Sequence, residues 1–92
     1  TQIKLEEQLK IWTLPNPAKD FIQFSIEVKE KISGKFFIMN TLGQEVASLS
    51  EGSLEVGNHS FKLKTNHLPN GTFHYVFVTA GGRLSGTFLL QR

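Results

Sequence analysis

The sequence has 92 residues, of which 39% are hydrophobic and 20% charged, with a formal net charge of +2 at pH 7. A chain of this length forms one domain, and its eight Phe residues supply enough apolar surface for a single core. The absence of Cys excludes disulfides, thiolate metal sites and a Cys nucleophile. The basic residues are scattered, which argues against a nucleic-acid surface. No apolar run approaches the roughly 18 residues of a membrane span.

We expect residues 1–8 to link the domain to an upstream part of a longer protein, and residues 9–92 to form the domain itself. The opening residues lack the apolar segment of a signal peptide. After a first strand at Leu9–Thr13, the run Phe21–Val28 alternates apolar and polar residues with a period of two. One face of this second strand therefore carries only apolar side chains, namely Ile22, Phe24, Ile26 and Val28.

The rest of the chain holds further short segments with the same alternation. Strands are predicted around residues 34–40, 45–49, 60–64, 72–79 and 84–90, of which 45–49 is the weakest. The residues expected to share a face are Phe36 with Ile38, Phe61 with Leu63, Phe73 with Tyr75 and Phe77, and Phe88 with Leu90. In the segment 34–40 the opposite face, with Phe37 and Met39, is also apolar. Short strands without intervening helices predict an all-β antiparallel sandwich, with a barrel as the alternative.

Glycine, proline and asparagine mark the turns between these strands. Asn40–Gly43 suits a type I turn followed by a glycine with positive φ, and Leu68–Gly71 places Pro and Gly where a turn needs them. Gly81–Gly82 predicts a tight two-residue hairpin, and Gly57–Asn58 predicts another change of direction. Pro15–Pro17 forces an extended segment, because both prolines lack an N–H group.

The sequence carries no recognisable catalytic or metal-binding pattern. The histidines His59, His67 and His74 lack metal-ligand spacing, and Asp20 is the single aspartate. No Gly-x-Ser-x-Gly motif marks a Ser nucleophile. We therefore expect no enzyme activity, no metal and no cofactor.

Trp12 and Phe37 have two interpretations. Large aromatic side chains are normally buried, so we expect both to pack in the core or between the sheets. The alternative is an exposed aromatic platform that binds a sugar.

Four segments, in order, resemble the type A C-terminal sorting domains of the bacterial type IX secretion system. The first, Leu14–Ile22, contains a Pro-Asn-Pro-Ala motif followed by an apolar strand, and the second, Phe36–Val46, contains a strand, a turn glycine and a valine. The third, Leu68–Phe73, has a leucine, a glycine and an aromatic residue, and the fourth is Gly82 with the run 87–92. The resemblance covers nearly the whole chain.

This resemblance implies an immunoglobulin-like antiparallel β-sandwich of about seven short strands, placed at the end of a larger cargo protein in Bacteroidetes. The cargo would cross the inner membrane by its own signal and then leave the periplasm through the type IX outer-membrane translocon. A sortase-like protease commonly removes such a domain, and the cargo is secreted or attached to the cell surface. The implied partners are the translocon, the protease and the upstream cargo domain, with no nucleic acid and no membrane span.

The candidates for recognition by the translocon are Pro15, Asn16, Pro17, Gly43, Gly71, Gln91 and Arg92. The proline motif would also act as an edge-strand breaker, and the glycines as turn residues with positive φ. The last two residues are expected to contribute little to folding, so they are either a charged recognition signal or a frayed chain end.

The chain departs from the family pattern at three positions. Leu14 and Phe73 stand where Tyr is usual, and Gly86 stands where the last strand often carries a polar or basic residue. These departures leave the expected fold unchanged and affect the details of recognition. The alternative function is a stalk or a carbohydrate-binding sandwich appended to a secreted enzyme. Such a module is free to lie anywhere in its parent, whereas a sorting domain lies at the C-terminal end.

Overall fold

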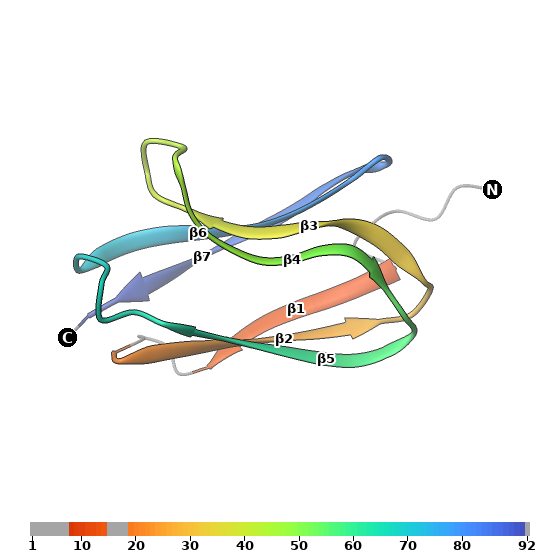
Figure 1. Cartoon of the computed structure of the whole chain (residues 1–92), viewed down its shortest axis with the longest axis horizontal. Helices are drawn as coiled ribbons and strands as arrows, with labels where there is room; N and C mark the ends of the chain where they lie inside the picture. The colour runs from red at the N-terminus through yellow and green to blue at the C-terminus, as the bar shows by residue number, and fades with distance from the viewer. Residues whose placement is uncertain (1–7, 15–18, 92) are drawn as a thin grey trace.

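The chain folds into two antiparallel β-sheets that lie face to face (Figure 1). The computed structural model describes residues 8–14 and 19–91. The strands of this part are β1 (Leu9–Leu14), β2 (Phe21–Val28), β3 (Ile32–Met39), β4 (Glu45–Leu54), β5 (Gly57–Lys64), β6 (Gly71–Thr79) and β7 (Gly82–Leu90). The sheets have the orders β1-β2-β5 and β4-β3-β6-β7. The predicted all-β, immunoglobulin-like antiparallel sandwich is confirmed, and the barrel is excluded.

The alternating pattern of β2 places its apolar face in the core. Ile22, Phe24 and Ile26 have no exposed surface, and Val28 is 2% exposed. The residues predicted to share faces on the other strands are also buried, namely Phe36, Ile38, Leu63, Phe73, Phe77, Phe88 and Leu90, with Phe61 and Tyr75 partly buried against them. The predicted apolar face of β2 is therefore confirmed, whereas β6 also buries Val76 on its opposite face.

Phe24 lies at the centre of an aromatic cluster that joins the two sheets. Its ring meets those of Phe36, Tyr75 and Phe88 edge to face, with centroid distances of 5.4, 5.7 and 5.6 Å. The three partner rings come from β3, β6 and β7, in the sheet opposite β2. Such pairs contribute about 0.5–1.5 kcal/mol each beyond the burial of area. The cluster therefore stabilises the contact between the sheets.

The strand predicted as weakest is the longest. β4 continues beyond residues 45–49 to Leu54, with register irregularities against β3. Gly57 and Asn58 are the first residues of β5, so the turn predicted there is wrong. The chain instead crosses from the four-stranded to the three-stranded sheet through residues 55–56.

The hairpin between β6 and β7 is displaced by one residue from its predicted position. Thr79 pairs with Gly82, so the two loop residues are Ala80 and Gly81. The Gly81 N–H donates to Thr79 Oγ1 at 3.1 Å, which helps to close the loop. A two-residue hairpin is therefore confirmed, and the pairing of Thr79 decides its position.

Two glycines inside strands allow close packing. A Cβ atom at Gly34 of β3 would lie 2.2 Å from the carbonyl oxygen of Val78 in β6. A Cβ atom at Gly86 of β7 would lie 2.2 Å from the phenol oxygen of Tyr75 and 2.3 Å from its ring carbon Cζ. Any side chain at either position would force its neighbours to move. The ring of Tyr75 therefore occupies the space that a side chain at position 86 would need.

The sandwich is elongated, with extents of 44 × 25 × 18 Å. Its strands run along the long axis, so the connections gather at two ends (Figure 1). One end, on the left in Figure 1, holds the β3–β4 turn (residues 40–44), the β5–β6 loop (residues 65–70) and Gln91, and we name it the turn end. Leu9, at the start of β1, pairs with Val28 at the opposite end.

Candidate functional site

The fold brings the described candidate residues together at the turn end. Gly43 lies in the β3–β4 turn, and Gly71 begins β6, where it pairs with Leu90 of β7. Gln91 follows Leu90 directly and is exposed. Three candidates that are far apart in the sequence are therefore located at one end of the sandwich (Figure 1).

The remaining candidates lie outside the described residues: Pro15, Asn16, Pro17 and Arg92. The strands on either side of the proline motif nevertheless have their adjoining residues at the turn end. Phe21, which begins β2, pairs with Lys64, which ends β5 and precedes the β5–β6 loop. Leu14, the last residue of β1, is 63% exposed at the same end.

The β3–β4 turn is held by Asn40. Its side-chain Oδ1 accepts hydrogen bonds from the backbone N–H groups of Leu42 and Gln44, both at 3.0 Å. Its backbone carbonyl accepts from the Gly43 N–H at 3.0 Å, and its own N–H donates to the Gln44 carbonyl at 2.9 Å. Gly43 has a φ of +82°, in the left-handed region that favours glycine. The predicted turn with a positive-φ glycine is confirmed.

The β5–β6 loop is anchored to the segment that leads into β2. Thr65 is fully buried, and its hydroxyl donates to the carbonyl of Lys19 while its N–H donates to the carbonyl of Asp20 at 3.0 Å. The Leu68 N–H donates to the Thr65 carbonyl at 2.9 Å, and the Leu68 side chain is buried. A buried hydroxyl without such a partner would be costly, so these bonds favour one loop conformation.

A cavity of about 210 Å³ lies between the turn and the loop. Asn40, Thr41 and Val46 line it from the β3–β4 hairpin, and the segment Leu68–Phe73 lines it from the other side. The turn and the loop contain no Asp, Glu, Lys or Arg. The turn end therefore combines two ordered connections, whose own residues carry no charge, with a partly apolar cavity between them.

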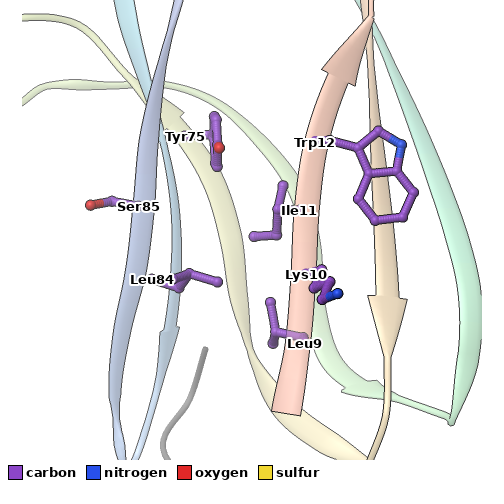
Figure 2. A pocket seen from close by; sticks show the side chains of 7 residues that line it. All are labelled: Leu9, Lys10, Ile11, Trp12, Tyr75, Leu84 and Ser85. Carbon is purple, nitrogen blue, oxygen red and sulfur yellow. The ribbon is translucent and has the colours of Figure 1, made fainter. Parts of the chain in front are cut away.

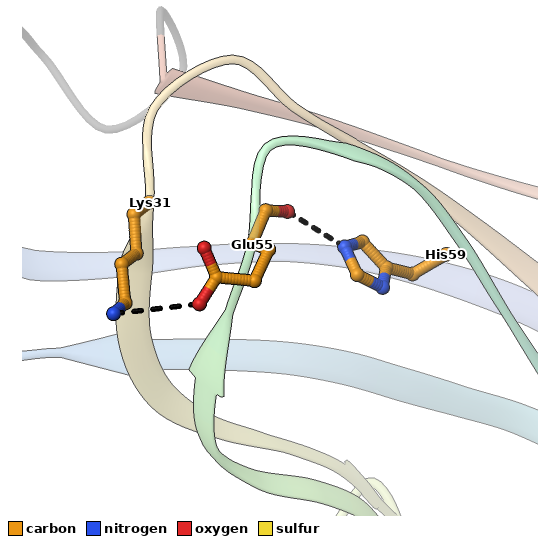
Figure 3. Close-up of polar contacts among 3 residues, drawn as sticks. All are labelled: Lys31, Glu55 and His59. Carbon is orange, nitrogen blue, oxygen red and sulfur yellow. Dashed lines mark hydrogen bonds and ion pairs between the residues drawn. The ribbon is translucent and has the colours of Figure 1, made fainter.

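The opposite end carries polar contacts at the connection between the sheets (Figure 3). Lys31 Nζ lies 3.4 Å from a carboxylate oxygen of Glu55, and the His59 Nε2–H donates to the Glu55 carbonyl at 2.7 Å. The ion pair is exposed, so it contributes little to stability. Among the described residues, no group of three or more His, Asp or Glu could hold a metal ion.

A second cavity, of about 340 Å³, lies between the free edges of β1 and β7. Figure 2 shows that Leu9, Ile11 and Leu84 project into the gap between these strands, together with the ring of Tyr75. Burial raises the pKa of Tyr75 above its ordinary value of 10.0, so its phenol stays protonated at neutral pH. The lining contains no carboxylate and no imidazole.

The two aromatic residues considered as a sugar platform lie on different sheets. Trp12 is 44% exposed, so its predicted burial is wrong. Leu9 and Ile11 occupy the inward positions of β1, which leaves Trp12 on the outer face (Figure 2). Phe37 is half-buried on β3, with Lys35 Nζ 5.3 Å from its ring centroid. Because β1 and β3 belong to different sheets, the two rings do not form one surface.

The fold and the turn end define a small β-sandwich module with an ordered loop surface at one end. The chain belongs to the family of secretion system C-terminal sorting domains, which it matches over residues 12–90. The expected resemblance is thereby confirmed, and membership implies export as a signal of type IX secretion. A comparison with curated proteins found no match. In the part of the chain that the structure describes, no helix is long and apolar enough to cross a membrane.

Leu42 is a feature of the turn end that the sequence analysis did not single out. Its side chain is 81% exposed, in the middle of the β3–β4 turn. The sequence does contain a clue to this residue. Polar residues and glycine dominate such turns, whereas Asn40-Thr41-Leu42-Gly43 has a leucine at its third position.

Proposed function

We propose that this domain is the address that directs a larger cargo protein across the outer membrane through the type IX secretion system, and that the translocon binds it at the turn end. The observation that carries the proposal is the convergence of Gly43, Gly71 and Gln91 at one end of a member of the sorting family. The role is recognition by protein partners rather than catalysis.

The position of β1 supports this proposal. Leu9 begins β1 at the end opposite Gln91, and the long axis of the sandwich measures 44 Å. A cargo domain joined ahead of β1 would therefore lie away from the turn end and leave it accessible. The same address would serve cargo proteins of different size and shape.

After translocation, a sortase-like protease removes the domain, and the cargo is secreted or attached to the cell surface. Residues 1–8 are the proposed linker between cargo and sandwich. A cut ahead of Leu9 would keep all the strands from β1 to β7 intact, so processing would not require the sandwich to unfold.

The export of a reporter tests the proposal. Residues 1–92 are fused to the C-terminus of a periplasmic reporter that has its own inner-membrane signal, in a host with the type IX system. The intact fusion should reach the medium or the cell surface, and the fusion lacking Gln91 and Arg92 should remain in the periplasm as a folded protein. Gln91 follows the buried Leu90 and is exposed, so its loss removes little packing.

Each part of the proposal has its own contradictory outcome. Failure of the intact fusion to leave the periplasm would contradict the sorting function. Normal export of the shortened fusion would contradict only the proposed role of Gln91 and Arg92 in recognition. The matched control is the intact fusion in a host that lacks the translocon, where export should be absent.

A further inference from the structure

We propose that Leu42 is an apolar anchor that a protein of the export machinery receives in an apolar pocket. This inference rests on the proposed sorting function and names one contact of the turn end. Leu42 is 81% exposed, the largest value among the exposed large hydrophobic residues that the structure describes. Single exposed apolar residues are common on protein surfaces. The inference therefore depends on the surroundings of Leu42 as well as on its exposure.

Neither the core nor the turn uses the side chain of Leu42. The turn uses its backbone N–H, which donates to Asn40 Oδ1 at 3.0 Å, and every amino acid except proline provides that group. Polar residues are the usual choice at such positions, because their side chains bond to water and to the local backbone. Leucine therefore adds nothing to the turn that a polar residue would lack.

The backbone that carries Leu42 is ordered before any partner binds. Asn40 bonds to the backbone of Gly43 and Gln44, and its Nδ2 donates to the Gln44 side-chain oxygen at 3.0 Å. A side chain presented from a fixed turn loses less conformational entropy on binding than one presented from a loose loop. The turn thus suits an anchor residue, whose contribution to affinity depends on its being positioned in advance.

The surroundings of Leu42 define the chemistry of its partner. The cavity of about 210 Å³ that Thr41, the neighbour of Leu42, helps to line also has Val46, Leu68 and Phe73 in its lining. Anionic lipids and nucleic acids are bound through clusters of basic residues, and the β3–β4 turn and the β5–β6 loop contain none. The two lysines beside the loop, Lys62 and Lys64, line a different pocket together with Asp20. An exposed apolar residue on an ordered turn, whose neighbour Thr41 lines a partly apolar cavity, has the composition of a protein–protein interface. The partner is therefore a protein with a pocket for leucine.

Substitution at two exposed positions separates this contact from general effects of surface change. Leu42→Ser removes the anchor, and Val56→Ser is the matched control. Val56 is an apolar residue that is 63% exposed at the opposite end, between Leu54 and Gly57. Leu42→Met restores an apolar side chain of similar volume. All three changes are made in the reporter fusion that carries residues 1–92.

We expect Leu42→Ser to reduce export by about 10-fold or more, as the loss of one buried leucine weakens binding. Val56→Ser and Leu42→Met should be exported as the unchanged fusion is. The isolated domains should have the same melting temperature, because an exposed side chain contributes little to folding. In size-exclusion chromatography the unchanged domain should be a monomer.

The results that overturn the inference differ from those that overturn the sorting function. If the Leu42→Ser fusion and the unchanged fusion are both exported normally, the inference that Leu42 is an anchor is wrong, and the sorting function still stands. Absence of export of the unchanged fusion overturns the sorting function and, with it, the anchor. A lowered melting temperature of Leu42→Ser would assign the side chain to folding. If the unchanged domain were a dimer and the Leu42→Ser variant a monomer, the side chain of Leu42 would be assigned to self-association.

Discussion

Replacement of Gly86 by alanine should destabilise the domain by displacing the ring of Tyr75. The new Cβ atom would lie 2.2 Å from the phenol oxygen and 2.3 Å from ring carbon Cζ, which is far closer than van der Waals contact. The same ring meets Phe24 and Phe36 edge to face, at centroid distances of 5.7 and 6.3 Å. Movement of the ring would therefore disturb the aromatic cluster between the sheets.

The expected loss follows from two opposing contributions. Overpacking of a core costs about 1–3 kcal/mol, and each aromatic pair that separates adds about 0.5–1.5 kcal/mol. Alanine in a strand is itself favoured over glycine by about 0.5–1 kcal/mol. We expect Gly86→Ala to lower the free energy of unfolding by about 1–3 kcal/mol, a large part of the roughly 5–14 kcal/mol typical of a domain this size.

A double-mutant cycle measured by urea denaturation tests the explanation. In the background Tyr75→Val the ring is absent, so the addition of Gly86→Ala should be neutral or stabilise the domain by up to about 1 kcal/mol. Gly34→Ala is the contrasting variant, because its Cβ would meet the backbone carbonyl of Val78 at 2.2 Å. Its cost should be the same in both backgrounds.

The cycle also provides the result that would refute the reasoning. If Gly86→Ala costs as much with Val at position 75 as with Tyr, the ring of Tyr75 is not the cause. The requirement for glycine would then come from another contact of β7.

Two further predictions concern the core. Phe24→Ala should lower the free energy of unfolding by about 3–5 kcal/mol, because the ring is fully buried between the sheets. Lys64→Ala, on the exposed face, should change it by less than about 0.5 kcal/mol. If chemical denaturation gave similar losses for the two variants, the assignment of the strand faces would be inverted. Tyr75 is the single tyrosine, so an ultraviolet titration should report its pKa above 10.0 in the folded domain and near 10.0 in urea. Because the folded pKa is raised, this group's contribution to stability is complete below pH 10 and is lost as the pH rises through the folded pKa. A folded-state pKa at or below 10.0 would contradict the burial of the phenol.

Strand faces were predictable from the sequence because they depend on local geometry. Successive side chains of a strand point to opposite sides, so the period of two in Phe21–Val28 identified the buried face without knowledge of the partner strand. The turn at Asn40–Gly43 was predictable for the same reason, since Asn bonds to its own backbone and Gly accepts a positive φ. The four segments that resemble the sorting family were also recognisable in the sequence.

Features that depend on the pairing of strands were harder to predict from the sequence. The hairpin loop at Ala80–Gly81 was displaced by one residue, because the pairing of Thr79 with Gly82 sets its position. β4 appeared weak in the sequence, yet it pairs along its length with β3. Strand order and register depend on contacts between residues far apart in the chain, which a local pattern does not contain.

The sequence by itself determined the fold class, the core face of β2 and membership of the sorting family. Only the tertiary structure decided that Gly43, Gly71 and Gln91 share one end, and that Leu42 stands exposed among them. It also decided that the ring of Tyr75 occupies the space above Gly86. The physical reason is the same in each case, because these relations are set by the order of strands in two sheets and by the contact of one sheet with the other.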